Sequence, residues 1–257
     1  MDLLYHSLQI ADHVATVTMT HPPVNAQSRP FREEGIRLFD WLSDAEEVRC
    51  VVLTGAGKVF SAGADLKERV GMAPEQGDYL RHNRQVRDYF FAVADCEKPV
   101  IAAVNGPAIG AGFALMLACD IMLAADTAFV QMPEVDVGLA GGTAFIAEHF
   151  GKSRARAMYF TARRYPAAEL YRLGVIEQVL PADALLEAAM VYAREIAAKS
   201  PLAIRTAKRA FMTVETMPVR EAYRYEQSLT VALSRSDDTR EAQRAFVEKR
   251  KPVFKGG

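Results

Sequence analysis

The segment from Met132 to Gly142 places one carboxylate, Glu134, between an apolar run and a glycine-rich turn. Apolar surroundings raise the pKa of a carboxyl group toward the range in which it both accepts and returns a proton. Glu134 is therefore the candidate acid/base residue. A glutamate that caps a helix or pairs with a cation is the alternative. Asp136, two residues on, is harder to aim at the same point.

Two loops of small residues precede this carboxylate, SAGADL at 61–66 and NGPAIGAGFA at 105–114. Each follows an apolar strand and opens toward a helix, whose first N–H groups have no intrahelical acceptor and lie at the positive end of the helix dipole. Two such loops from successive parallel repeats would converge on one carbonyl oxygen and stabilise an enolate formed from a thioester. The first loop alone also fits a tight strand-to-helix connection, with Asp65 as a helix cap.

Alternating strands and helices must position these loops. Ser28 is placed to cap a helix over 30–45. The pattern predicts a hairpin over 4–20, further strands at 50–54, 100–104 and 121–124, an apolar run at 128–130, and helices at 76–96 and 111–118. Strand alternating with helix implies crossover connections and mainly parallel sheet. Helices at 182–199, 202–214, 219–233 and 239–247 complete the chain, which we divide into a core, 1–195, and a C-terminal helical region, 196–257.

Composition excludes several classes of protein. Of 257 residues, 31 are basic and 32 acidic, so the general electrostatic attraction used by nucleic-acid and anionic-membrane binders is missing. Cys50, Cys96 and Cys119 are single and flanked by apolar residues, which indicates reduced core thiols. The histidines form no metal-ligand set. Without a signal peptide or an apolar run of about 20 residues, the expected location is the cytoplasm.

Taken together, SAGADL, KPVIAAVNGPAIGAGFALMLACDI, MPEVDVGL and AFVEKRKPVF resemble the crotonase family, also called the enoyl-CoA hydratase/isomerase family, over nearly the whole chain. The resemblance implies an α/β fold, a spiral of repeated ββα units, with C-terminal helices that mediate homotrimers, often paired into hexamers. It also implies an acyl-CoA substrate, with coenzyme A as part of that substrate and no further cofactor.

Carried over residue by residue, the resemblance makes the N–H groups of Ala64 and Ala111 the oxyanion hole and Glu134 the retained glutamate. Ala111 stands where many members have glycine, but any residue other than proline keeps the N–H group. The expected lining of the coenzyme A path is Ala26, Ala62, Ala64, Asp65, Leu66 and Ala111, joined by Phe246 and Lys249 from the C-terminal helix, commonly of an adjacent subunit.

The sequence departs from the family hydratases at Ala114, where those enzymes carry a second glutamate. One carboxylate moves one proton between two carbons more easily than it adds water, so isomerase-type or lyase-type chemistry is favoured. The dienoyl isomerase variant is disfavoured, because Ala114 and Gly142 occupy the places of its aspartates. Decarboxylation, dehalogenation and carbon–carbon cleavage stay open.

Two alternatives stay open as well. A hydratase could draw the missing group from Tyr79, His82, Asn83, Tyr223 or Tyr225, although a packing or surface role is favoured for each. His149 is expected to be an ordinary helix-end histidine. A non-catalytic acyl-CoA-binding protein is the other alternative. RNA binding is disfavoured, because the sequence contains no basic stripe.

Overall fold

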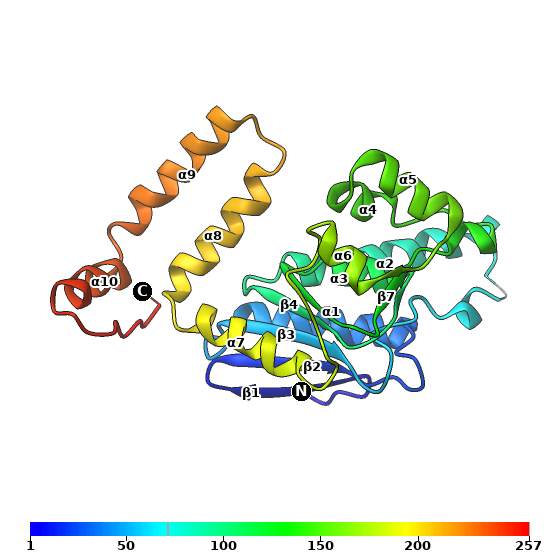
Figure 1. Ribbon diagram of the computed structural model, residues 1–257, viewed down its shortest axis with the longest axis horizontal. Coiled ribbons are helices and arrows are strands. Elements are labelled where there is room, and N and C mark those ends of the chain that lie inside the picture. Colours follow the sequence, from blue (N-terminus) through cyan, green and yellow to red (C-terminus); the bar gives the residue numbers. More distant parts are fainter. Residues whose placement is uncertain (71, 257) are drawn as a thin grey trace.

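The computed structural model describes residues 1–70 and 72–256. Its N-terminal half contains β1 (His6–Ala11), β2 (Val14–Met19), α1 (Arg29–Asp44), β3 (Cys50–Gly55), η1 (Leu66–Arg69), η2 (Pro74–Gln76), α2 (Asp78–Ala94), β4 (Val100–Val104), β5 (Ala108–Ile109), α3 (Ala111–Leu117), β6 (Ile121–Ala125) and β7 (Phe129–Gln131). The rest contains η3 (Glu134–Val137), α4 (Thr143–His149), α5 (Lys152–Thr161), β8 (Tyr165–Pro166), α6 (Ala167–Arg172), β9 (Gln178–Leu180), α7 (Leu185–Ala197), α8 (Pro201–Val214), α9 (Val219–Leu233) and α10 (Asp237–Val247) (Figure 1).

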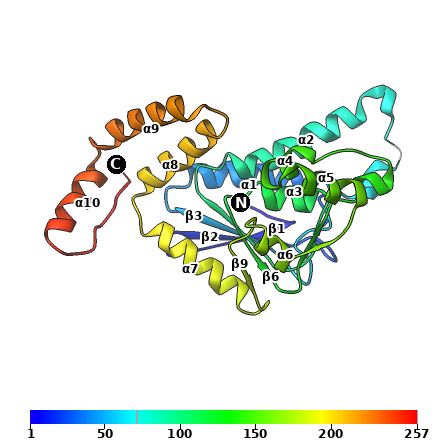
Figure 2. The same ribbon diagram turned by 45° about the horizontal axis from the view of Figure 1, so that its top comes forward.

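The larger sheet has the strand order β1-β2-β3-β4-β6-β9, and every neighbouring pair except β1–β2 is parallel. Helix α7 packs against β2, β3, β4 and β6 from one side, while α1 and α2 pack together on the other side (Figure 2). All five residues of β4 are buried, as expected of a strand covered on both faces. The prediction of a mainly parallel sheet is confirmed.

The chain winds as a spiral in which each turn repeats two strands and a helix. First strands β3, β4 and β6 pair in parallel, and the second strands β5 and β7 pair likewise in a smaller sheet with β8. In the first turn the second strand is reduced to one residue, Ser61, which forms a parallel bridge to Ala108 of β5. Residues that directly follow the second strands are therefore stacked along one edge of the spiral.

Helix α1 begins where the sequence predicts. The side chain of Ser28 accepts a hydrogen bond from the N–H of Phe31, and Pro30 lies in the first turn, where its missing N–H is not needed. The apolar face of the helix, including Phe31 and Phe39, is fully buried. This packing fixes the segment just before α1, residues 24–28, against the loops of the spiral.

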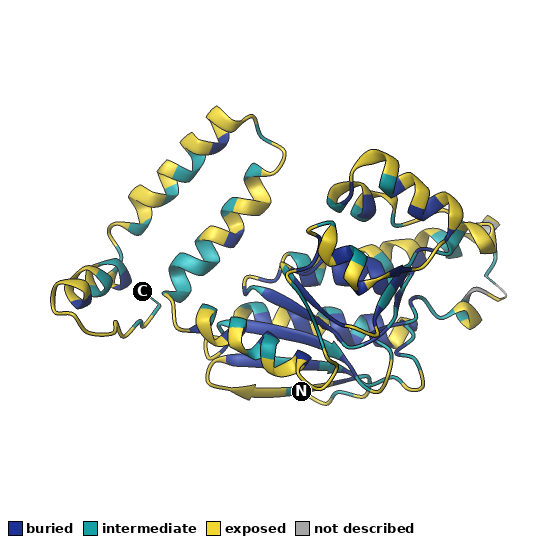
Figure 3. Cartoon of the chain, in the orientation of Figure 1, coloured by how far each residue is buried: buried dark blue, intermediate teal, exposed yellow. Residues whose placement is uncertain are grey.

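Helices α8, α9 and α10 stand to one side of the spiral (Figure 1), and most residues of α9 and α10 are exposed, whereas most of α8 is half-buried (Figure 3). Lys208 of α8 ties them to the core through an ion pair of 2.8 Å with Asp120. The boundary that we placed between residues 195 and 196 falls in the last turn of α7, and residues 198–200 link α7 to α8. Within the described ranges, no helix combines the length and apolar character needed to cross a membrane.

Candidate active site

A cavity of about 130 Å³ brings together residues from three turns of the spiral. Ala64, Ala111 and Glu134, the three residues to which sequence analysis assigned chemistry, all line it. The other lining residues are Tyr79, His82, Asn83, Val86, Phe90, Gly110, Ala114, Met132, Leu139, Ala140, Gly141 and Gly142.

The spiral explains why residues 47 and 23 positions apart in sequence meet. Ala64 follows the Ser61 bridge, Ala111 follows β5, and Glu134 follows β7, so each comes shortly after the second strand of its turn. We call residues 61–66 the first amide loop and residues 105–111 the second. The two loops are bonded directly, since Ile109 N–H donates to the carbonyl of Ser61 over 3.0 Å.

Gly63 makes this close approach possible. A β-carbon at position 63 would stand 2.4 Å from the carbonyl oxygen of Ile109 and 3.0 Å from the backbone nitrogen of Ala111. Gly63 also has φ +86, which side chains disfavour. Both steric facts require glycine, and together they set the spacing between the amide loops.

The peptide groups that carry the two candidate N–H donors are anchored through their carbonyls. Gly63 O accepts from Gln27 N–H over 2.8 Å, and Gly110 O accepts from Ala114 N–H over 3.0 Å. In a trans peptide the C=O and the following N–H point in opposite directions. The N–H groups of Ala64 and Ala111 therefore point away from these partners, and neither donates a hydrogen bond within residues 1–70 and 72–256.

Glu134 is half-buried and is the first residue of η3. Its side chain lies against Gly110, the residue before Ala111: a β-carbon at position 110 would stand 2.7 Å from Glu134 Oε1. Asp136 is exposed, and it is not among the residues that line the cavity.

Ala114 is 2% exposed and faces the same cavity from α3. The position at which the family resemblance places a second glutamate in hydratases therefore belongs to the cavity wall, and here it carries only a methyl group. Among the described lining residues, Glu134 is the one carboxylate. Gly142 also lines the wall.

Helix α2 supplies the polar part of the wall. Tyr79, His82 and Asn83 line the cavity, a position that we had not favoured for them. His82 and Asn83 follow Tyr79 by three and four residues, which puts both beside Tyr79 on one helix face, but choosing that face from sequence requires knowing where α2 packs. Tyr223 and Tyr225 lie on α9 and do not line the cavity.

The other residues assigned to coenzyme A lie outside the cavity wall. Asp65 caps η1, its Oδ1 accepting from Lys67 N–H over 2.9 Å, and Leu66 is 56% exposed. Ala26 and Ala62 are half-buried in the adjoining segments. Phe246, on α10, and Lys249, just beyond it, are exposed and do not reach the cavity of their own chain.

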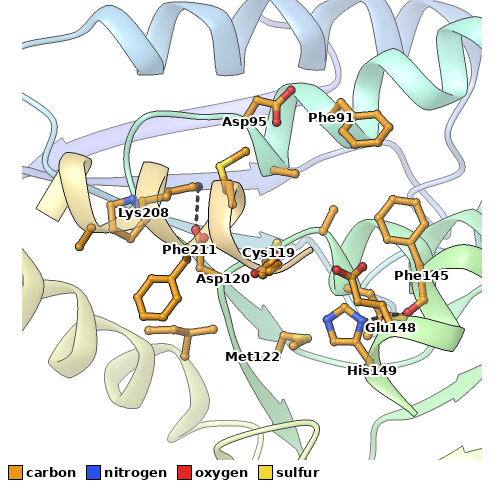
Figure 4. Close-up of a pocket in the computed structure, with 18 of the residues that line it drawn as sticks. Phe91, Asp95, Cys119, Asp120, Met122, Phe145, Glu148, His149, Lys208 and Phe211 are labelled. Carbon is orange, nitrogen blue, oxygen red and sulfur yellow. Dashed lines mark hydrogen bonds and ion pairs between the residues drawn. The ribbon is translucent and has the colours of Figure 1, made fainter. Parts of the chain in front are cut away.

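A larger cavity of about 820 Å³ lies between α8 and the core, lined by the ends of α2, α3 and α4 (Figure 4). It includes the Lys208–Asp120 ion pair, Phe211 and His149, but none of the residues to which we assigned chemistry. His149 ends α4, and its Nδ1 lies 2.9 Å from the carbonyl of Phe145, as expected for a helix-end histidine. We therefore place the candidate active site in the smaller cavity.

The thiols are buried, as predicted, and they suit no nucleophilic role. Burial raises the pKa of Cys50 to about 12, and burial also raises the pKa of Cys96 and Cys119. The thiolate fraction at neutral pH is correspondingly small. No cluster of three or more potential metal ligands occurs in the part of the chain that the structure describes.

A sequence model of the enoyl-CoA hydratase/isomerase family matches residues 9–257. A hydrolase of (7aS)-7a-methyl-1,5-dioxo-2,3,5,6,7,7a-hexahydro-1H-indene-carboxyl-CoA from Rhodococcus jostii is 36% identical, over 94% of this chain and 93% of its own. The mitochondrial Δ(3,5)-Δ(2,4)-dienoyl-CoA isomerase of Pongo abelii is 34% identical, over 96% and 81%. A crystal structure of enoyl-CoA hydratase from Bacillus anthracis superposes with a TM-score of 0.93 at 34% identity, covering 99% of this chain and 100% of that one. The chain belongs to the enoyl-CoA hydratase/isomerase, or crotonase, family.

Proposed function

We propose that this protein is an enzyme that forms an enolate from an acyl-CoA thioester, with the N–H groups of Ala64 and Ala111 bonded to the thioester oxygen. One observation carries the proposal: Ala64, Ala111 and Glu134 each come shortly after the second strand of a turn of the spiral, and all three residues line one small cavity. Fixed donors aimed at a developing negative charge contribute several kcal/mol, roughly 2.7–4 for each donor removed in comparable sites.

Glu134 is the proposed acid/base residue. Its carboxylate lies against Gly110, one residue before the proposed donor Ala111, so a substrate whose thioester oxygen is held there has its α-carbon near Glu134. A base beside the α-carbon removes the proton whose loss from the thioester forms the enolate, and it returns a proton to the same or a vinylogous carbon. This transfer changes no oxidation state, so the chemistry itself requires no redox cofactor.

Ala114 favours isomerase-type or lyase-type proton transfer over hydration, because no second carboxylate faces Glu134 from the described cavity wall. The observation that keeps hydration as the second candidate is the presence of Tyr79, His82 and Asn83 in the same wall. These side chains are able to orient a water molecule for attack.

Coenzyme A is proposed to run from the first amide loop past Ala26, Ala62, Asp65 and Leu66. These residues adjoin Ala64 but do not line the smaller cavity. Phe246 and Lys249 would then contact the coenzyme of a neighbouring subunit. Large apolar side chains left exposed on α8, α9 and α10 support assembly through these helices; they are Phe211, Met212, Val219, Val231, Phe246 and Val247. A homotrimer, alone or paired as a hexamer, is the proposed state, and light scattering after gel filtration measures it.

Exchange of α-protons distinguishes the enzyme from a non-catalytic acyl-CoA-binding protein. The protein is incubated in D₂O with a panel of saturated, 2-enoyl, 3-enoyl and aromatic CoA thioesters, and deuterium at the α-carbon is measured by mass spectrometry. Exchange or conversion of at least one thioester is the expected result. Binding of panel members with neither exchange nor conversion would establish the binder instead.

A further inference from the structure

Gln27 lies between the two amide loops and is fully buried. Its backbone N–H donates to Gly63 O over 2.8 Å, in the first loop. Its side-chain Nε2 donates to the carbonyl of Ala111 over 3.2 Å, at the end of the second loop, and lies 3.3 Å from Ser61 Oγ. One residue is therefore bonded to both loops.

The backbone bond of Gln27 acts on the peptide that carries the N–H of Ala64, whereas its side-chain bond acts on the peptide that follows Ala111. Gly63 O belongs to the peptide whose N–H is that of Ala64, so the bond from Gln27 N–H sets the direction of that donor. The side chain holds the carbonyl of Ala111 itself, which limits rotation of the backbone around the second donor. Because the backbone and side chain of Gln27 are covalently joined, the two donors are held at a fixed separation.

Gln27 is itself held by Arg32 of α1. The guanidinium of Arg32, 1% exposed, donates to the carbonyl of Gln27. The same guanidinium donates to Glu68 Oε2 over 3.1 Å and to Gln85 Oε1 over 3.2 Å, and its Nη2 lies 3.5 Å from His82 Nδ1. These contacts connect Gln27 to the part of the cavity wall formed by α2, so residues of α1 and α2 together hold Gln27 in place between the two amide loops.

We propose that Gln27 is a positioning residue for the reaction: its side chain bonds the second amide loop, its backbone bonds the first, and it thereby sets the separation of the Ala64 and Ala111 N–H groups. This inference rests on the proposed function, in which those two groups bind the thioester oxygen. Donors in such a site act only when they lie about 2.7–3.1 Å from the oxygen, and a shift of about 1 Å lowers the rate on the order of 10²-fold.

The variant that tests the role is Gln27→Met, which keeps the side-chain volume and the backbone bond to Gly63 but removes the bond to Ala111. Infrared spectroscopy of bound [1-¹³C]butyryl-CoA measures the thioester C=O stretch, which moves to lower frequency when the oxygen accepts hydrogen bonds. We expect a smaller downshift in the variant than in the wild type, and α-proton exchange slower by about 10-fold to 100-fold. The dissociation constant for butyryl-CoA should change by less than about 3-fold, because most contacts of the ligand are kept.

Gln178→Met is the matched control, since Gln178 is a half-buried glutamine that bonds Tyr192 and hydrogen-bonds neither amide loop in the described residues. Its downshift and exchange rate should equal those of the wild type. Gln27→Asn, whose shorter amide cannot span to Ala111, provides a second variant and should behave like Gln27→Met. If a folded Gln27 variant showed the same C=O downshift and the same exchange rate as the wild type, the inference about Gln27 would be overturned, while the proposed function would stand. Absence of any downshift in the wild type would instead overturn the proposed function.

Discussion

The carboxylate of Glu134 lies against the α-carbon of Gly110, so closely that a β-carbon there would stand 2.7 Å from Glu134 Oε1. Gly110 has φ +54, in the region that side chains rarely adopt, and it immediately precedes α3. This glycine turns the chain into α3, whose first residue, Ala111, lines the cavity, and it leaves the space that the Glu134 carboxylate occupies.

Gly110→Ala should lower kcat by about 100-fold, because the new methyl group displaces the Glu134 carboxylate and strains the turn before α3. Steady-state kinetics on the best CoA thioester of the panel measure the effect. Gly138→Ala is the control: Gly138 has φ +71 but nothing within 4 Å of the added carbon, so it shows the backbone strain without the contact. Equal activity losses in both variants would contradict a specific role for the Gly110–Glu134 contact.

Ala114→Glu should give the protein hydratase activity with crotonyl-CoA, because Ala114 is buried in the wall of the same cavity as Glu134. A second carboxylate there allows one group to activate water while the other protonates the α-carbon. Spectrophotometric loss of the enoyl thioester measures hydration. Ala114→Gln introduces a side chain of nearly the same volume as glutamate but without the charge, and it should show no hydratase activity. Hydration by both variants would refute the acid/base explanation.

Stability should fall as the pH drops below about 6.5, because of the buried pair His6–Glu34. Burial lowers the pKa of His6, and this effect outweighs the hydrogen bond to Glu34, which acts to raise it. Burial raises the pKa of Glu34, but hydrogen bonds from Leu4 N–H, His6 and Tyr5 N–H outweigh it, so that this pKa is also lowered. Both groups then bind fewer protons in the folded than in the unfolded protein, so their contribution to stability is full above pH 6.5. It is lost as the pH falls from the ordinary pKa of each group, 6.5 for His6 and 4.5 for Glu34, toward its lowered pKa in the folded protein.

Urea unfolding at pH 7.5, 6.0 and 5.0 measures this dependence. His6→Asn should flatten the part of the curve between pH 7.5 and 6.0. His13→Asn, which alters an exposed histidine, should leave the curve like that of the wild type. An unchanged slope in His6→Asn would exclude His6 as the source.

Lys208→Met should destabilise the junction between α8 and the core. Lys208 Nζ lies 2.8 Å from Asp120 Oδ2 and donates to the carbonyl of Lys98 over 3.1 Å, and only 6% of its side chain is exposed. Because Asp120 is about a third exposed, we expect a loss of about 1–3 kcal/mol rather than the larger penalty of a fully buried pair. Arg209→Met, next in sequence, removes an exposed pair with Glu97 and should cost less than about 0.5 kcal/mol. Equal unfolding free energies for the two variants would contradict this prediction.

Much of the fold was predictable because its signals are local. The apolar runs of β3, β4 and β6 and the Ser28 cap of α1 appear directly in the sequence, as do the four C-terminal helices. The strands β8 and β9 were missed, since two or three residues give no alternation to detect, and their pairing with β7 and β6 depends on the finished spiral. Of α4, only its end at His149 was predicted, and α5 and α6 were missed. The hydrophobic periodicity of α5 is weak, and α4 and α6 are only seven and six residues long.

The candidate site likewise contains residues that local sequence signals predict and residues that only the folded structure brings into the cavity. Glu134 and the two loops were identified from glycine spacing and one carboxylate, and the family resemblance then specified Ala64 and Ala111. The polar wall of Tyr79, His82 and Asn83 was not favoured, because which face of α2 meets the cavity is decided by packing against α1 and α3. Gln27 was not singled out at all. A buried glutamine beside an apolar helix face carries no motif, and its role depends on the distance between two loops.

The most direct test of the proposed function is α-proton exchange by Glu134→Gln, with Asp136→Asn as the matched control in the same turn. In D₂O with butyryl-CoA, exchange by Glu134→Gln should be slower than that of the wild type by about 10²-fold or more, while the dissociation constant changes by less than about 3-fold. Asp136→Asn, at an exposed position, should exchange like the wild type. Wild-type exchange in Glu134→Gln would contradict the assignment of Glu134 as the group that moves the proton.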